Sequence, residues 1–395
     1  MRVGIIEIME TGHLELAETI CRIYCSDPAN MVYFLTIEKH AGNMKPLCDR
    51  YPNLEVIPGA AGDTGCIFAR ADSLSLDRVY LVTLIRYFRE TAAWKSRSKF
   101  FLTVHNLDEW FGHSFISGAC KFFDSFFHNF SLKLIAYSFK VNFIYPRYKK
   151  MILGNVRESG GKLVVLSESV HNELLKLKPG IPSEVLPFSV YDPAIGDVGE
   201  AITGGPLKIC VPGILSQYRR DYLGLLDMLE EKLSAVKDEF SIDFLGGVNT
   251  DNPLDKAQLI IKRIEKLQAK GFNITYHSVR FIPSQEYEKE LSHADIILGN
   301  MNIDLNKFSR YGKTKETGLP FAMIKAGKAG ILPDDYPYPA GLSSGVISYH
   351  SKSEIAGILA GLIKDRGQLD ILKRNAIENS IKFTPAAIYK KLVHN

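Results

Sequence analysis

The feature that most constrains this chain is a regular alternation of short apolar runs with longer stretches of helical periodicity. In the first half, β-branched residues enrich the runs, which predict strands over 3–9, 32–37, 54–57, 100–104, 163–166 and 185–186. Helical patterns between them predict helices over 13–24, 40–50, 74–93 and 169–176. This alternation predicts a parallel sheet covered by helices on both faces.

The same alternation starts again after a segment that has no apolar period. Residues 191–206 (YDPAIGDVGEAITGGP) are rich in Asp, Gly and Pro, as linkers are. Beyond them, strands are predicted over 208–211, 242–245, 274–277, 296–298 and 330–332, and helices over 222–232, 254–270, 285–292 and 320–326. The chain has 395 residues, more than one core usually serves. We therefore predict α/β architecture with two Rossmann-like domains, 1–190 and 207–375, joined by the linker 191–206.

Composition excludes several classes of protein. Hydrophobic residues make up 46% and charged residues 23%, as in ordinary globular proteins. The formal charge of +4 is too small to imply nucleic acid, so no nucleic-acid partner is expected. The six cysteines are scattered, the N-terminus lacks a signal-peptide pattern, and every window of about 20 residues carries charge. We expect free thiols and a cytoplasmic protein whose attachment to the inner face of the cell membrane, if any, is peripheral.

A loop in the second half gathers groups that suit an anion. Lys313 and Lys315 precede Thr317 and Gly318, which stand directly before the helix predicted over 320–326. Backbone amides at a helix start, together with cations and a hydroxyl, favour phosphate. The alternative is a solvated loop with two ordinary surface lysines.

The order of elements in 281–332 resembles the C-terminal domain of GT-B glycosyltransferases. Upstream, VPGILSQYRRDYLGLL resembles that group's strand, glycine, loop and basic residue ahead of a helix. The resemblance implies two domains facing each other across a cleft and a nucleoside diphosphate sugar as donor. It also implies that Arg219 or Arg220 contacts the donor diphosphate, with Gly213 ending the strand. The alternative is a pair of surface arginines at a helix start.

The sequence departs from the retaining members of that group at one motif. They carry Glu-x7-Glu, in which the first Glu lies near the donor sugar and the second binds the ribose. Glu316 corresponds to the first, but Ile324 stands where the second belongs. The usual proline after the helix is also replaced, by Ala329 and Gly330. We therefore expect a degenerate motif and a different ribose contact.

Two groups in the first half follow predicted strands. Gly12 and His13 open a helix after the first strand, where GT-B enzymes place a glycine-containing loop near the donor; the alternative is a tight turn. In FFLTVHNLDEWFG, a strand delivers His105, Asp108 and Glu109 at its carboxyl end.

The resemblance implies that His105 contacts the donor sugar or the transition state. Asp108 and Glu109 are candidate bases for the acceptor hydroxyl if the enzyme inverts the configuration of the donor sugar. The alternative is that the histidine caps the strand end and the acids are solvated.

Aromatic and basic residues are interleaved over 111–151. This pattern is typical of interfacial helices that enter anionic headgroups, so membrane docking is one hypothesis. The alternative is a core helix, because Phe122, Phe126 and Phe130 follow a helical period. The tail FTPAAIYKKLV (383–393) predicts a final helix that starts near Pro385, and the C-terminal helical segment 376–395 is expected to pack back on the first domain.

These features together predict a glycosyltransferase of the hexosyltransferase type. Its acceptor would be a hydroxyl of a lipid-linked or surface glycan in polysaccharide biosynthesis. No cofactor and no metal are expected, because Asp334 and Asp335, the adjacent acid pair, lie in a Pro-rich turn. Two alternatives remain: a nucleotide-sugar 2-epimerase of the same architecture, and a nonenzymatic nucleotide-sugar-binding partner in a synthesis complex.

Overall fold

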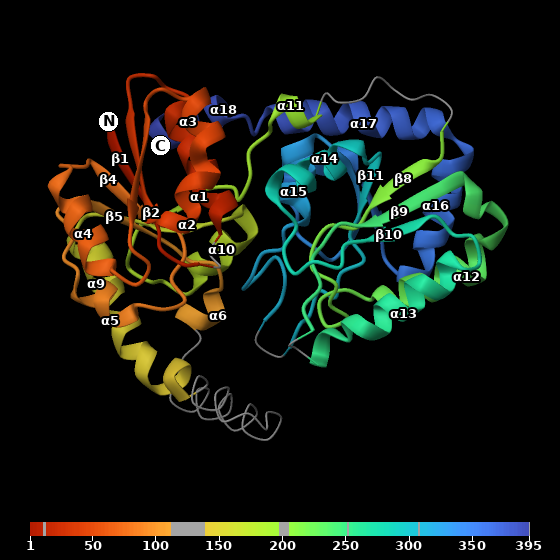
Figure 1. Ribbon diagram of the computed structural model, residues 1–395, viewed down its shortest axis with the longest axis horizontal. Coiled ribbons are helices and arrows are strands. Elements are labelled where there is room, and N and C mark those ends of the chain that lie inside the picture. Colours follow the sequence, from red (N-terminus) through yellow and green to blue (C-terminus); the bar gives the residue numbers. More distant parts are fainter. Residues whose placement is uncertain (11–12, 112–138, 197–204, 251–252, 307–308, 395) are drawn as a thin grey trace. The chain divides into compact units, whose positions relative to one another are not determined.

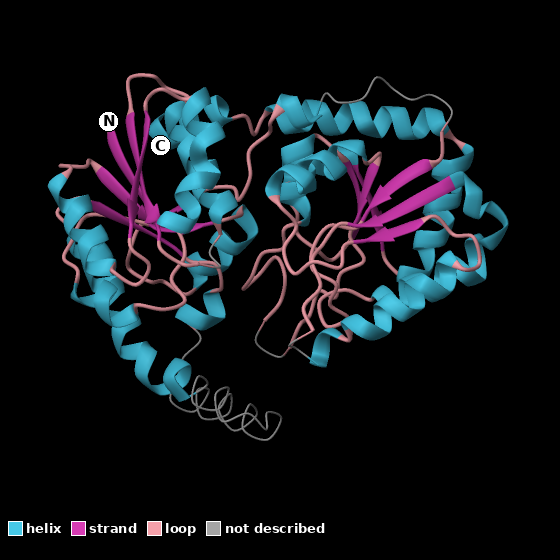
Figure 2. Ribbon diagram, in the orientation of Figure 1, coloured by secondary structure: helices cyan, strands magenta, loops and turns pink. Residues whose placement is uncertain are grey.

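The computed structural model describes residues 1–10, 13–111, 139–196, 205–250, 253–306 and 309–394. They form two compact units, which Figures 1 and 2 show as two sheets with helices packed around each. Unit 1 is Met1–Phe188, Lys313–Glu316 and the segment from Ile388 onward; unit 2 is Ser189–Gly312 and Thr317–Ala387. The predicted α/β class with two Rossmann-like halves is confirmed.

Unit 1 is built on a sheet of seven parallel strands in the order β3-β2-β1-β4-β5-β6-β7. The strands are β1 (Arg2–Glu7), β2 (Met31–Ile37), β3 (Leu54–Gly59), β4 (Arg78–Leu81), β5 (Lys99–Thr103), β6 (Leu163–Val165) and β7 (Ser183–Val185). The chain runs outward from β1 to β3 and then returns to β4 on the other side of β1. A crevice beyond the carboxyl ends of β1 and β4 is therefore the expected ligand position in this sheet.

Helices cover both faces of this sheet, which explains the nearly continuous apolar runs of its strands. They are α1 (Leu14–Cys25), α2 (Glu38–Ala41), α3 (Lys45–Arg50), α4 (Thr64–Ser73), α5 (Phe88–Ala93), α6 (Leu107–Trp110), α9 (Tyr145–Glu158) and α10 (Glu168–Lys176), with short turns η1 (Gly42–Met44) and η2 (Lys140–Ile144). Alternate strand residues such as Ile6 and Leu102 pack in one buried cluster with α4 and α9.

One predicted helix of unit 1 is wrong. Residues 74–93 form β4 and α5 separated by a loop, and the helix α4 that precedes them was not predicted. Val79 and Leu81 face the cluster with α4 while Tyr80 faces the opposite side, and all three are fully buried. The run RVYLVTLIRYF is apolar on both strand faces, so its two-residue period is hidden.

Unit 2 is built on six parallel strands in the order β10-β9-β8-β11-β12-β13. They are β8 (Leu207–Cys210), β9 (Phe240–Phe244), β10 (Ile274–Tyr276), β11 (Ile296–Leu298), β12 (Ala329–Pro333) and β13 (Val346–Tyr349). The strand order reverses between β8 and β11. The loops after these two strands, 211–221 and 299–318, therefore flank the crevice where such sheets bind ligands.

Two groups of helices sandwich the second sheet. One buried cluster joins it to α12 (Tyr222–Leu233), α13 (Ala257–Gln268), α16 (Ile355–Lys364) and α17 (Arg366–Ile381). The other joins it to α11 (Pro193–Gly196), α14 (Ser284–His293) and α15 (Leu319–Ala326). Short helical turns complete the unit: η3 (Ser234–Glu239), η4 (Pro253–Asp255), η5 (Ala340–Gly345) and η6 (Lys352–Glu354).

The final helix predicted to start near Pro385 is confirmed as α18 (Pro385–His394), whereas residues 376–381 of the predicted C-terminal segment 376–395 are the end of α17. Pro385 cannot continue the preceding helix. The Tyr389 hydroxyl donates to Asp27 Oδ2 (3.0 Å) and to Asn30 Oδ1 (3.3 Å), so the end of α18 is tied to unit 1. Across the described ranges, no helix combines the length and the apolar character needed to span a bilayer.

Candidate functional site

Two histidines meet at the carboxyl edge of the first sheet. His13 precedes α1 and His105 follows β5, and their rings stack with centroids 4.3 Å apart. Phe188, after β7, packs edge-on against His13 at 5.5 Å. The His13 amide donates to Thr83 Oγ1 (3.1 Å), which fixes the start of α1 beside the loop after β4. The predicted glycine of this loop, Gly12, lies outside the described residues.

Both imidazoles are held neutral. Burial, the neighbouring His13 and Lys315 lower the pKa of His105 to about 3 against a weaker opposing hydrogen bond. Desolvation and Lys315 lower the pKa of His13, and Glu15 opposes them. His105 Nε2 lies 2.9 Å from the Val82 carbonyl, which only accepts hydrogen bonds, so Nε2 carries the proton. His105 Nδ1 is therefore a hydrogen-bond acceptor at neutral pH.

A buried carboxyl group lies at the end of β1 in the same unit. Glu7 is fully buried, and its Oε1 accepts a hydrogen bond from the Met9 amide (2.8 Å). Burial raises the pKa of Glu7 to about 7, although hydrogen bonds from Thr83 and from the backbone of the following loop oppose the shift. Sequence inspection gave no signal for this residue, because a strand-end Glu is usually solvated.

The segment Lys313–Glu316 belongs to unit 1, although the chain on either side of it belongs to unit 2. Asn106 forms an antiparallel bridge with Lys315, and the Leu107 amide donates to the Thr314 carbonyl (2.7 Å). The structure therefore brings Lys315 to the same edge as His105. Lys313 is exposed.

Glu316 is held by hydroxyls at the start of α10. Ser167 donates to its carboxylate, and Ser169 Oγ lies 3.4 Å from the same oxygen. Ser167 also caps α10 by accepting from the Val170 amide (3.2 Å). Neither serine was a sequence candidate, because the contact joins residues about 150 positions apart. A role of Glu316 at the donor sugar stays a prediction.

The two candidate bases follow His105 on α6. Glu109 is exposed, and its Oε1 accepts from Asn106 Nδ2 (2.7 Å); Asp108 is half-buried. Lys149, a buried residue of α9, donates to the Glu109 carbonyl (2.6 Å) and lies over the rings of Phe88 and Trp110. The end of α6 is therefore held by a buried ammonium group. Lys149 belongs to the stretch 111–151, for which the sequence left membrane docking and a core helix as alternatives.

In unit 2, Arg220 lies against Gly213 at the end of β8. Arg220 is 6% exposed, and a Cβ built on Gly213 would lie 2.7 Å from one guanidinium nitrogen. Gly213 has φ +109°, a conformation that favours glycine. Among the described residues, no carboxylate forms an ion pair with Arg220, and its Nε has no hydrogen-bond partner. A buried guanidinium of this kind calls for an anionic ligand.

The other predicted donor-site residues of unit 2 lie at different positions. Arg219 is exposed and contacts the neighbouring loop through its backbone, since its carbonyl accepts from the Asn302 amide (2.9 Å). Thr317 is buried and Gly318 is exposed as the residue that caps α15. The predicted phosphate loop is thus divided, with Lys313, Lys315 and Glu316 in unit 1 and the Thr-Gly pair in unit 2.

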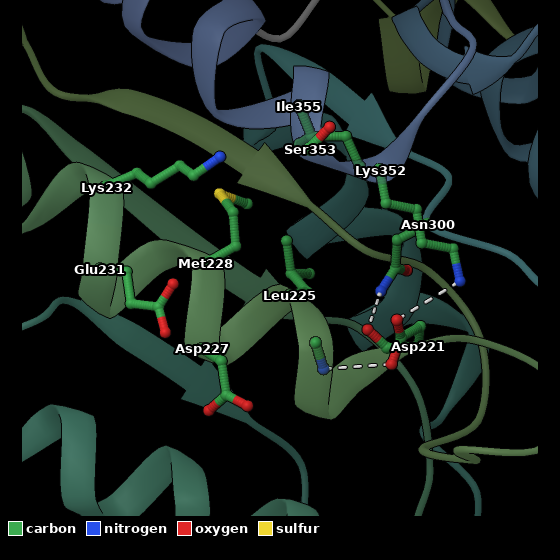
Figure 3. A pocket seen from close by; sticks show the side chains of 11 residues that line it. Asp221, Leu225, Asp227, Met228, Glu231, Lys232, Asn300, Lys352, Ser353 and Ile355 are labelled. Atoms are coloured by element: carbon green, nitrogen blue, oxygen red, sulfur yellow. Dashed lines mark hydrogen bonds and ion pairs between the residues drawn. The ribbon is translucent and has the colours of Figure 1, made fainter.

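Two hollows adjoin the loop that carries Arg220. One, of about 570 Å³, opens beside Gln217, Tyr218 and Asn302 at the carboxyl edge of β11 to β13. The other, of about 240 Å³, lies between α12 and η6, and Figure 3 shows Asp221, Asn300 and Lys352 at one end of it. Lys352 lines both hollows, and no sequence signal had distinguished it from other surface lysines.

No protein-family model and no curated protein matches this sequence. Solved structures at 11% identity match its whole length: the N-terminal domain of Candida albicans trehalose-6-phosphate phosphatase (TM-score 0.60, covering 100% of this chain and 95% of that chain) and HepE of Anabaena in complex with UDP-glucose (0.57; 100% and 98%). WaaG, a glycosyltransferase involved in lipopolysaccharide biosynthesis, matches with 11% identity (0.54; 99% and 98%). The similarity shows that this chain has the GT-B fold.

Proposed function

We propose that this protein transfers a sugar from a nucleoside diphosphate sugar to a hydroxyl acceptor. The observation that carries the proposal is the buried guanidinium of Arg220, which lies on Gly213 at the switch point of the second sheet and has no carboxylate partner among the described residues. A diphosphate supplies the charge that such a group requires. HepE, which shares the fold, was solved with UDP-glucose bound.

The chemistry that Arg220 supplies is electrostatic. Negative charge develops on the departing diphosphate as the bond to the sugar breaks, and a fixed, desolvated guanidinium stabilises it without reorganisation. Arg220 meets this requirement better than Arg219, because its side chain is buried against Gly213. Thr317 and Gly318 stay candidates for further donor contacts through the start of α15, and the role of Lys315 at the donor stays a prediction.

The histidine pair of unit 1 supplies a different kind of group. With the proton on Nε2, the Nδ1 atom of His105 accepts a hydrogen bond from a sugar hydroxyl. A neutral ring adds no positive charge that would compete for the diphosphate. If the enzyme inverts, the acceptor proton passes to Asp108 or Glu109, the carboxylates nearest to this histidine in the chain. No metal is required in this scheme, because the protein's own cations neutralise the diphosphate.

We propose a lipid-linked or surface glycan as acceptor, at the inner face of the cell membrane. WaaG, which shares the fold, acts in lipopolysaccharide biosynthesis. On η2 and α9, the exposed side chains Ile144, Arg147 and Met151 follow a helical period, with Lys140 and Lys150 beside them. Apolar and basic groups on one face favour an anionic bilayer surface. Most of the stretch 111–151, namely 112–138, lies outside the described residues.

The experiment that tests the donor site is a thermal-shift screen with UDP, GDP, TDP, CMP and their sugars. One nucleotide diphosphate should raise the melting temperature of the wild-type protein. Arg220→Ala should abolish the shift, whereas Arg219→Ala, the matched control one residue away, should keep most of it. An unchanged shift in Arg220→Ala would place the donor elsewhere. Donor binding without transfer or hydrolysis, across a broad panel of glycan acceptors, would favour a nonenzymatic binding protein.

A further inference from the structure

Two loops of unit 2 are joined by a short antiparallel contact that includes Arg220. The Asp221 amide donates to the Asn300 carbonyl (3.1 Å), and the Asn302 amide donates to the Arg219 carbonyl (2.9 Å), with Arg220 between them. Asn300 Nδ2 donates to the Asp221 carbonyl (3.1 Å), as Figure 3 shows. The backbone of Arg220 is therefore held on both sides by the loop that follows β11.

The side chain of Asn302 extends this contact along the loop 217–221, which carries Arg220. Its Nδ2 donates to the carbonyls of Gln217 (3.1 Å) and Tyr218 (3.2 Å), and its Oδ1 accepts from Lys352 Nζ (2.8 Å). Both amide hydrogens and one carbonyl lone pair are thus used by the protein itself. The geometry is that of a clamp, because one planar amide fixes two successive carbonyls of a loop.

Lys352 links the clamp to the start of α12. It lies on η6, whose first turn is fixed by a capping box between Ser351 and Glu354. Its Nζ is also 3.5 Å from Asp221 Oδ2, and Asp221 caps α12 by accepting from the Gly224 amide (3.1 Å). Figure 3 shows the side chain of Lys352 directed at Asp221. Three loops therefore converge on the residues that flank Arg220.

We propose that Asn302, held in place by Lys352, is a positioning residue that sets the path of the loop 217–221 and so directs Arg220 over Gly213. This inference rests on the proposed function, in which Arg220 stabilises the donor diphosphate. Asn302 acts through the loop backbone. Its effect on the donor passes entirely through Arg220, whose guanidinium leaves Gly213 when the loop relaxes.

The decisive variant is Asn302→Asp, which keeps the size of the side chain and the contact with Lys352. Its carboxylate cannot donate a hydrogen bond, so its oxygens repel the carbonyl oxygens of Gln217 and Tyr218 and the loop 217–221 loses its contact with residue 302. Backbone amide exchange over 214–224 should become about tenfold faster in the full-length protein, a change of about 1.4 kcal/mol in local opening. The matched control is Asn375→Asp on α17, whose Nδ2 donates to the Ser344 carbonyl (2.9 Å); it should leave exchange over 214–224 unchanged.

A double-mutant cycle then tests whether the effect passes through Arg220. Asn302→Asp should weaken binding of the nucleoside diphosphate found in the thermal-shift screen by about tenfold, yet add nothing in an Arg220→Ala background. Titration at higher nucleotide concentrations than in the screen measures the residual affinity of the Arg220→Ala variants. Lys352→Met should change affinity in the same direction. Unchanged exchange over 214–224, or additive losses in the cycle, would overturn the positioning role. If the wild-type protein binds no nucleotide, the proposed function fails, and the exchange measurement still decides whether the clamp exists.

Discussion

Arg220 covers the Cα of Gly213 so closely that a single added carbon at position 213 would lie 2.7 Å from the guanidinium. The two residues are seven positions apart and lie at opposite ends of the loop after β8. Two features require glycine at this position: the close contact with the guanidinium and the backbone φ of +109°.

Gly213→Ala should therefore displace Arg220 and remove the thermal shift given by the nucleoside diphosphate. It should also lower the free energy of unfolding by about 1–3 kcal/mol, because alanine is strained at positive φ. The matched control is Gly357→Ala in α16, where an added Cβ meets nothing within 4 Å. Chemical denaturation of both variants checks the stability, and a preserved thermal shift in Gly213→Ala would contradict the proposed arrangement.

Glu7→Gln should change the pH dependence of stability. The pKa of Glu7 is about 7 in the folded protein against 4.5 as the ordinary value, so the wild type loses stability as pH rises from about 4.5 to 7. Glutamine stays neutral and should gain roughly 3 kcal/mol relative to the wild type across that window. Urea denaturation at pH 4.5 and pH 8 measures the difference, and equal pH profiles would show that Glu7 ionises normally.

His105 should remain neutral far below the usual range of histidine. Its pKa of about 3 means that the wild type loses stability as pH falls from about 6.5 toward 3, because the unfolded chain binds the proton first. The imidazole Cε1–H resonance, followed by NMR, should not titrate above about pH 4. Lys315→Met should move the midpoint upward, since Lys315 opposes protonation. A midpoint near 6.5 would refute a desolvated His105.

Reversing charge on the exposed stripe of η2 and α9 should weaken membrane attachment. Lys140, Arg147 and Lys150 changed together to Glu should abolish flotation with vesicles that contain anionic lipid, because each cation near the surface contributes about 1 kcal/mol. Lys149 is left intact because it is buried under α6. A triple reversal of Lys232, Lys262 and Lys266 is the control of equal charge. Equal flotation of both variants would exclude this docking face.

Chelation should leave transfer unaffected. With Arg220 as the cation at the diphosphate, activity in the presence of excess EDTA should stay within about twofold of the untreated protein. Loss of activity in EDTA, restored by added Mg²⁺ or Mn²⁺, would instead show that a metal ion neutralises the charge of the diphosphate.

The sequence predicted the fold more completely than the site. Most strands were located to within two residues, because each is a short apolar run between helical patterns. β4 was missed because its apolar stretch hid the strand period, and β13 and α16 were missed because no pattern was recognised between residues 332 and 376. The sequence identified Arg219 and Arg220 as candidates for the diphosphate contact but did not decide between them, since only the packing against Gly213 distinguishes the two side chains. Glu7, Ser167 and Asn302 depend on long-range contacts, which no local pattern encodes.

The assignment of Lys313–Glu316 to unit 1 has a consequence for how the protein can be divided. Unit 1 consists of three segments of the chain and unit 2 of two, so a cut near residue 188 yields no complete half. A fragment that ends there lacks the segment that bonds Asn106, Leu107 and Ser167. The two halves are thus interleaved pieces of one gene, and a single recombination event cannot exchange either of them intact for a homologous domain.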